Sequence, residues 1–335
     1  MSVTRISSRA RTYALYTGAP RQTACDAVAA LRPHEPVITN AARHEQLLLE
    51  SEVFYHVLSS QGAYCEYPFG IRYVQPTPQG LGIHLESSAA LDNLLSTLLP
   101  CRTPVGSGQD EIYGLNGVRI SARTEHGVEL RRLGQPTSIR LTGASRRAVG
   151  QAEAALVDRI RHIGGQACWL ADDTWTPYEK HWDNERQPLI YESLWRNAAW
   201  LPSGLLRRLG LLHTVATPQI VTGHEAQLGE CWVLRLEHDS DTSLRRAELV
   251  QALTDPHHGL PLELSGHRDL MPGGSLGLVL LKALDGTATL QLRYDRIDYP
   301  IREDRAGLFA AIRRRTSALT GEAMLPAMPG CSATG

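Results

Sequence analysis

Several residue types and patterns that would point to a function are scarce or missing in this 335-residue chain. Lys180 and Lys282 are the only lysines, so arginine carries almost all of the positive charge. The 34 basic residues nearly balance the 35 acidic ones, and the formal net charge is −1. This balance excludes a global electrostatic attraction to nucleic acid or to an anionic membrane. Any site for a polyanion must therefore be a local patch of arginine.

The six cysteines stand singly, and no two of them form a Cys-x-x-Cys pair. This absence excludes a zinc ribbon and a thioredoxin-like redox motif. Such wide spacing is typical of reduced thiols in an intracellular protein. No apolar run reaches the ~18 residues of a membrane span, and the longest one, 276–284, is interrupted by Lys282. We therefore expect no transmembrane segment, and we interpret 276–284 as a strand.

Recognisable catalytic and cofactor motifs are also missing. The chain has no Gly-x-x-x-x-Gly-Lys-[Ser/Thr] loop, no Gly-x-Ser-x-Gly turn and no His-Glu-x-x-His helix. One loose group of metal-ligating residue types has a spacing that fits no familiar metal site, and we interpret it as loop surface: His238, Asp239, Asp255, His257, His258 and His267. The sequence predicts no catalytic residue, no metal site and no cofactor. It favours a protein that is not an enzyme, although clusters formed only in space would not show in the sequence.

The N-terminal segment 1–25 is rich in arginine and serine and contains no Asp or Glu. This composition is typical of a mitochondrial transit peptide. The alternative interpretation is a disordered basic tail. The first interpretation predicts a mitochondrial location, and the second a cytoplasmic one.

Hydrophobic patterning predicts an α+β protein with two α+β units. The second unit includes a hairpin formed by 276–284 and 287–294, with Asp285-Gly286 as its turn. No close sequence repeat is visible, but the similar size of the two units suggests a repeated architecture. The expected division, in chain order, is a basic segment 1–25, a helix and hairpin lead-in 26–80, a first α+β domain 81–165, a Trp-rich helical connector 166–225, a second α+β domain 226–320 and a disordered tail 321–335.

The most legible stretch, 137–163, predicts a strand, a tight turn and an amphipathic helix. Ile139 and Leu141 alternate with polar residues, as in a half-buried strand. Ser145 is the expected N-cap, since its hydroxyl can accept a hydrogen bond from a first-turn N–H. Apolar residues then recur at helical spacing from Ala148 to Ile163.

Residues 81–163 are predicted to run strand, helix, glycine loop, short helix over 109–115, strand, variable loop, strand and helix. Ile112 and Gly117-Val118-Arg119-Ile120 match one part of a known pattern, and Ile139-Arg140-Leu141-Thr142-Gly143 matches another. In this order the stretch resembles a type I K-homology (KH) domain. The resemblance implies a three-stranded sheet backed by helices and binding of single-stranded RNA.

In that family a Gly-x-x-Gly loop lets main-chain N–H groups approach the nucleic-acid backbone. Here the loop reads Gly106-Ser107-Gly108, which is one residue shorter and carries no cation. Phosphate contacts would then come from nearby arginines, and the implied nucleic-acid site consists of Arg102, Gly106, Ser107, Gly108, Arg119, Arg140, Arg146 and Arg147. The alternative for each arginine is a solvated surface charge.

Degenerate KH-like units with an Arg-rich N-terminus are similar to fungal mitochondrial factors that link transcripts to translation. This likeness implies a role in translation regulation in mitochondria, with a membrane-associated or ribosomal protein partner. Two alternatives stay open. One is an enzyme or small-molecule-binding protein with a pocket between the two units, lined by His224, Glu225, Trp232 and Tyr294. The other is a structural scaffold, which would be favoured if the arginines form salt bridges within the protein.

Overall fold

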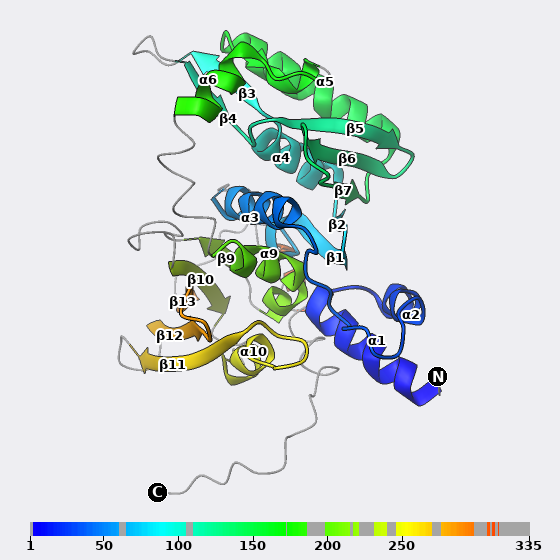
Figure 1. Cartoon of the computed structure of the whole chain (residues 1–335), viewed down its shortest axis with the longest axis vertical. Coiled ribbons are helices and arrows are strands. Elements are labelled where there is room, and N and C mark those ends of the chain that lie inside the picture. The colour runs from blue at the N-terminus through cyan, green and yellow to red at the C-terminus, as the bar shows by residue number, and fades with distance from the viewer. Residues whose placement is uncertain are drawn as a thin grey trace, which may run out of the picture.

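The computed structural model describes residues 3–59, 65–104, 110–171, 173–185, 198–214, 217–220, 231–239, 246–269 and 276–297, together with 307, 308, 310, 311 and 314. The described residues form an α+β fold, as predicted (Figure 1). The glycine loop residues Gly106, Ser107 and Gly108 lie outside them, as do His224, Glu225 and the expected tail 321–335.

The first sheet has the strand order β1-β2-β7-β6-β5. Its β2 and β7 are parallel, and every other neighbouring pair is antiparallel. The helices that belong to it are α3 before β1, α4 after β2 and α5 after β7. The bounds are α3 His44–Ser59, β1 Ile71–Thr77, β2 Gly80–Leu85, α4 Ser88–Leu98, β5 Val118–Thr124, β6 Gly127–Arg132, β7 Ile139–Thr142 and α5 Arg146–His162, with a short 3-10 turn, η1 Pro68–Gly70, before β1.

The second sheet repeats this plan with the order β9-β10-β13-β12-β11. Its β10 and β13 are parallel and its other pairs are antiparallel, so order and direction match the first sheet strand for strand. Even the bulge recurs, between Ile120 and Ala122 in β5 and between Leu264 and Gly266 in β11. The bounds are α9 Trp200–Arg207, η3 Leu209–Thr214, β9 Thr217–Ile220, β10 Cys231–Asp239, α10 Arg246–Leu253, β11 Leu262–Asp269, β12 Leu276–Ala283 and β13 Thr289–Ile297.

We call the first sheet with α3, α4 and α5 the first half, and the second sheet with α9 and α10 the second half. The two halves contact each other reciprocally. Helix α3 of the first half contacts β9 of the second, and α9 of the second half contacts β1 of the first. In the same way η3 contacts β1, and η1 contacts β9. These reciprocal contacts show that the halves are related as the two subunits of an isologous dimer are, but within one chain. The repeated architecture suggested by the sequence is therefore present as a repeated topology.

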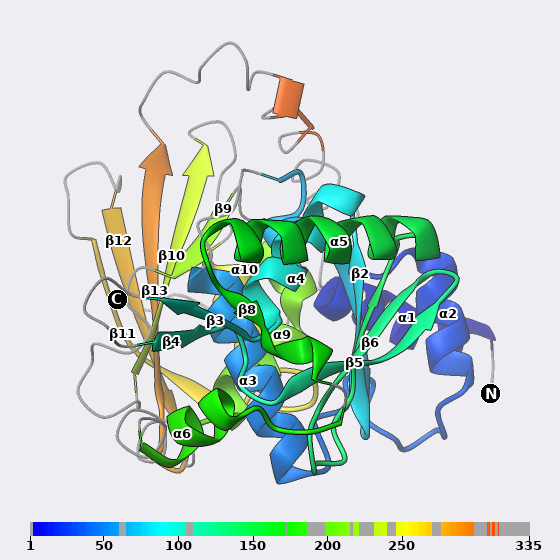
Figure 2. The same ribbon diagram turned by 90° about the horizontal axis from the view of Figure 1, so that it is seen from above.

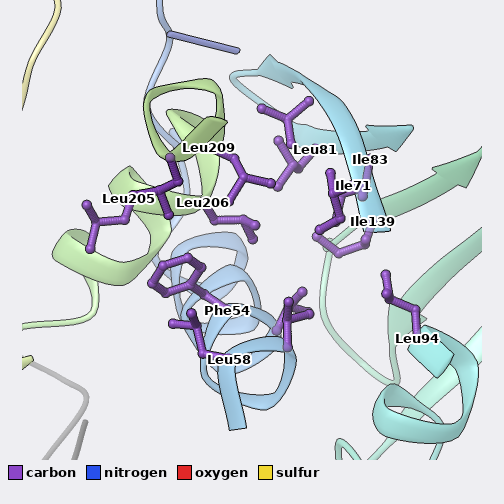
Figure 3. Close-up of a cluster of buried hydrophobic side chains, with 14 of the residues drawn as sticks. Phe54, Leu58, Ile71, Leu81, Ile83, Leu94, Ile139, Leu205, Leu206 and Leu209 are labelled. Carbon is purple, nitrogen blue, oxygen red and sulfur yellow. The ribbon is translucent and has the colours of Figure 1, made fainter. Parts of the chain in front are cut away.

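One continuous hydrophobic core joins the halves (Figure 3). Phe54 and Leu58 on α3 face Leu205 and Leu206 on α9, with the strand residues of β1, β2 and β7 on the other side. Phe54 also contacts Trp232 of β10, with a ring separation of 6.2 Å. Each Å² of apolar surface that this shared core removes from water stabilises the contact between the halves by about 25 cal/mol.

A buried ion pair lies at the junction. Glu50 of α3 and Arg207 of α9 are both 0 % exposed and 2.6 Å apart. The Arg207 guanidinium donates to both Glu50 oxygens and also to the carbonyls of Thr39, Thr77 and Gly80, so all five N–H donors are used. A charge can stay buried only when it is satisfied in this way.

The N-terminal segment is part of the fold. Helix α1 (Val3–Thr17) is followed by α2 (Arg21–Ala29), and the Tyr16 hydroxyl of α1 donates to the Ala252 carbonyl of α10 over 2.8 Å. The interpretation of this segment as a disordered tail is therefore wrong. A transit peptide that is cleaved would remove this contact, and the mitochondrial location stays a prediction.

The N-cap predicted at Ser145 is confirmed, and α4 begins with a serine cap as well. The Ser87 side chain accepts from the Ala90 N–H at the start of α4, and that of Ser145 accepts from the Ala148 N–H at the start of α5. The short helix predicted over 109–115 is wrong: β4 (Asp110–Tyr113) pairs there with β3 (Cys101–Pro104). These strands and β8 (Gln166–Ala167) form a separate three-stranded sheet, and the remaining strands of 81–163 join the larger sheet.

Candidate nucleic-acid interface

Arg119 does not belong to a surface for RNA. It lies on β5, but its side chain is 2 % exposed and pairs with Glu179, which is fully buried. Its guanidinium donates to both Glu179 oxygens over 2.9 and 2.7 Å and to the Thr174 carbonyl. Arg119 therefore fastens the segment after the first sheet to β5 and cannot reach a phosphate.

Glu179 belongs to a capping box that starts α6 (Pro177–Glu185). The Thr176 hydroxyl accepts from the Glu179 N–H, and the Glu179 carboxylate accepts from the Thr176 N–H. Burial alone would raise the pKa of Glu179, but hydrogen bonds from Arg119 and from the Thr176 and Gly117 amides outweigh burial and hold the pKa below its ordinary value. The carboxylate thus stays charged beside Arg119.

Three other predicted arginines lie at opposite ends of α5. Arg102 lies on β3, where it pairs with Gln166 just beyond the C-terminus of α5, and its guanidinium lies 4.2 Å from the centre of the Tyr178 ring. Arg146 and Arg147 occupy the first turn of α5 and are exposed. A helix of 17 residues at ~1.5 Å per residue separates them by about 25 Å. They do not form one patch.

Arg140 is the predicted residue that stands on an open strand. It lies on β7, is exposed and forms no ion pair with a described residue. It points away from the core, because Ile139 and Leu141 beside it are buried against the helices. This side of the first sheet, which we call the outer face, carries Tyr73, Gln75, Gly82, His84, Arg140 and Thr142.

Two rings stack on the outer face. Tyr73 of β1 and His84 of β2 are cross-strand neighbours, with ring centres 4.4 Å apart and planes at 14°. The Thr142 hydroxyl lies 3.1 Å from Nδ1 of His84 and holds the ring from the β7 side. Burial lowers the pKa of His84, and the nearby Arg72 guanidinium lowers it further. The imidazole is therefore neutral near pH 7 and presents an uncharged ring.

The outer face is bounded on both sides. Figure 2 shows α1 and α2 on one side of β2, opposite α3 and α4, and α1 also contacts β1. At the other end, Arg131 of β6 forms an ion pair with Asp173, and Trp175 lies against Gly117. Between these covers, the central strands β2 and β7 present His84, Thr142 and Arg140 to solvent. Glu129 lies opposite Arg140 on β6, but its carboxylate accepts from the Ser138 hydroxyl over 2.6 Å.

The pocket predicted between the two units is not formed by the described residues proposed to line it. Tyr294 is 0 % exposed in the core, and Trp232 is 3 % exposed against Phe54 and Tyr55 of α3. Within the part of the chain that the structure describes, no group of three or more metal-ligating side chains gathers. In that part, too, no helix has the length and apolarity needed to cross a membrane.

Comparison with known proteins adds no family to this geometry: no family model, curated protein or solved structure matches the chain. The likeness to a KH domain therefore rests on the residue pattern alone. Tyr73 and His84 were missed by sequence reasoning. Tyr73 and Gln75 on β1 alternate with buried residues, and so do Gly82 and His84 on β2. This alternation shows that they share the outward side of their strands, but it does not show which strands become neighbours.

Proposed function

We propose that the chain is a non-catalytic protein that associates with single-stranded RNA across the outer face of its first sheet. The observation that carries the proposal is Arg140, an exposed cation without an ion pair to a described residue, on the same face as the stacked Tyr73 and His84 rings. Sheet-based RNA-binding modules combine these features, since bases stack on rings while cations contact phosphates.

Arg72 supports the same surface. It is exposed at the bulge between Ile71 and Tyr73, and it lies close enough to His84 to lower the pKa of the imidazole. Together Arg72 and Arg140 flank the rings on β1 and β7. Single strands lie along such platforms by stacking, which is worth roughly 1–3 kcal/mol per base, while the cations add an attraction that depends on salt.

The likeness to fungal mitochondrial factors extends this proposal to translation regulation, with a ribosomal or membrane-associated protein as partner. A scaffold role is the second candidate, because Arg119 and Arg207 are indeed salt-bridged within the protein. Arg140, Arg146 and Arg147 form no ion pair with described residues, and this favours the RNA proposal.

A fluorescence-anisotropy titration with labelled single-stranded RNA at about 50 mM and 200 mM salt tests the proposal. We expect saturable binding that weakens as salt rises, because bound cations release counterions from the phosphates. Double-stranded RNA of the same sequence is the control and should bind more weakly, since its bases cannot stack on the rings. Binding weaker than ~10⁻⁴ M without a salt dependence would leave the scaffold role as the better account.

A further inference from the structure

A cavity of about 430 Å³ lies beside the outer face, between the N-terminal helices and the first sheet. One wall consists of Tyr13 on α1, Ala27 on α2 and Leu31 just after α2. The opposite wall consists of Gln75 on β1, Gly82 on β2 and Arg140 on β7. Its volume is within the range of small-molecule sites in proteins. Figure 2 shows α1 and α2 beside the first sheet, on the side that faces away from α3 and α4.

Glycine in β2 opens the cavity. Gly82 pairs with Gln75 on one side and with Arg140 on the other, so these three residues form one row across the outer face. A Cβ atom at Gly82 would lie 3.3 Å from the Gln75 Cβ, a tight contact. Glycine inside a strand often marks a place where another group approaches the backbone. Here it leaves room between the Gln75 and Arg140 side chains.

The lining combines apolar walls with one cation. Among the residues that line the cavity, none is acidic, and Arg140 is the charged one. Glu129, the nearest cross-strand carboxylate, is engaged by the Ser138 hydroxyl. Arg140 is exposed at the side of this space and forms no ion pair with a described residue, so its guanidinium is available to an anion bound there.

Tyr13 adds a hydroxyl group to the lining. Burial raises the pKa of Tyr13 to about 12, with Tyr73 adding to the effect, so the phenol is protonated at all physiological pH values.

We propose that this cavity binds a small organic anion that has a compact apolar body and one carboxylate, sulfonate or phosphate group. The anionic group pairs with Arg140, and the apolar body packs against Ala27 and Leu31. The inference goes beyond RNA association, since it requires the partly open cavity beside α2 and not the stacked rings. It also gives the N-terminal helices a role: they form one wall of the site.

Two fluorescent probes with nearly the same body separate the charge from the cavity. 1-Anilinonaphthalene-8-sulfonate carries one sulfonate, and N-phenyl-1-naphthylamine carries none. We expect the sulfonate to bind one site per chain, and Arg140→Gln to weaken it about tenfold, the value of one charge-assisted hydrogen bond. The uncharged probe should bind more weakly to the wild type and be unaffected by Arg140→Gln. Equal binding of both probes to both proteins would overturn the proposal.

A matched pair of substitutions on α2 tests the location. Ala27 lines the cavity, whereas Ala29 is exposed on the same helix and does not. Ala27→Phe should abolish binding of both probes, and Ala29→Phe should leave it unchanged, with circular dichroism showing that both variants are folded. Retained binding in a folded Ala27→Phe protein would contradict the proposal. Because Ala27→Phe leaves the stacked rings in place, its RNA titration should match the wild type, so the two proposals can fail separately.

Decanoate and AMP then serve as competitors of the sulfonate probe. They present a carboxylate on an aliphatic body and a phosphate on a nucleoside. Displacement by decanoate at lower concentration supports a hydrophobic carboxylic acid as the natural ligand class, and displacement by AMP at lower concentration supports a nucleotide. If neither competitor displaces the probe at millimolar concentration, the proposed class of ligand is wrong.

Discussion

The two halves of this chain share one strand plan and differ in what surrounds it. The first sheet is bounded by α1 and α2 at one end and by the segment that contains Glu179 at the other. The strands β3 and β4, which lie between α4 and β5 in the chain, form a separate three-stranded sheet with β8, which follows α5. Among the described residues, the second sheet has no such additions, and its edge strand β11 is mostly exposed. The difference places the candidate chemistry, Arg140 and the cavity, on the elaborated half.

We expect the largest loss of stability from a substitution at the buried ion pair between the two halves. Arg207→Met leaves the Glu50 carboxylate buried without its partner and frees three backbone carbonyls. Breaking one side of a buried pair costs about 3–5 kcal/mol, so we expect a large loss in the free energy of unfolding, measured by urea denaturation.

Arg123→Gln is the matched control for this junction. Arg123 also forms an ion pair with a glutamate, Glu153, but its side chain is 43 % exposed. An exposed pair contributes only ~0–1 kcal/mol. If the two substitutions cost the same, the Arg207 pair does not join the halves as described.

Glu179 holds the segment that contains α6 against β5 through its ion pair with Arg119. The stability that this contact provides should depend on pH. The pKa of Glu179 is lowered in the folded protein from its ordinary 4.5. The folded state therefore gains stability from the charged carboxylate at pH values above the ordinary pKa, and it loses this gain as pH falls through the lowered folded pKa.

Glu179→Gln should cost roughly 2–4 kcal/mol at pH 7, since it leaves Arg119 buried without a counter-ion. The difference between wild type and variant, taken from denaturation curves at several pH values, should be constant above about pH 5.5 and shrink in more acidic solution. A difference that does not change down to pH 3 would show that Glu179 is not a charged partner of Arg119 in the folded state.

One glycine from each half gives a comparison with a smaller expected effect on stability. Both glycines have a positive φ, but only one is crowded by neighbouring atoms. Gly143 after β7 has φ +95, and a Cβ there would lie 2.6 Å from the Leu85 carbonyl oxygen; Gly286 in the β12–β13 turn has φ +75 and open space. Gly286→Ala should cost about 1–2 kcal/mol from backbone strain alone. Gly143→Ala adds a clash and should cost roughly 3 kcal/mol or more. Equal changes in the thermal unfolding midpoint would argue against this difference in packing.

Sequence reasoning succeeded where a short stretch carries its own signal. Ser145 caps its helix, and Asp285-Gly286 forms the hairpin turn, because capping and turn chemistry need only neighbouring residues. It failed where the local structure depends on a partner segment elsewhere in the chain. The stretch 109–115 becomes a strand because β3 is available to pair with β4.

The candidate site shows the same limit. Arg119 and Arg140 both occupy outward positions on strands, and the sequence around them gives no reason to treat them differently. Arg119 is buried because Glu179, 60 residues later, folds over it, while Arg140 stays open beside Gly82 of a strand far earlier in the chain. The parallel pairing of β2 with β7 is a tertiary decision that no local pattern encodes.

The most direct test of the proposed RNA surface compares one arginine from each half. Arg140 lies on the outer face of the first sheet, and Arg268 is an exposed arginine on β11 of the second sheet. RNA anisotropy titrations of Arg140→Gln and Arg268→Gln over a series of salt concentrations measure the contribution of each. We predict that Arg140→Gln weakens binding several-fold and lowers the slope of log K against log salt by ~0.7, as expected for one lost phosphate contact, while Arg268→Gln changes neither. Equal effects of the two substitutions, or no effect of Arg140→Gln, would contradict the assignment of RNA binding to the first sheet.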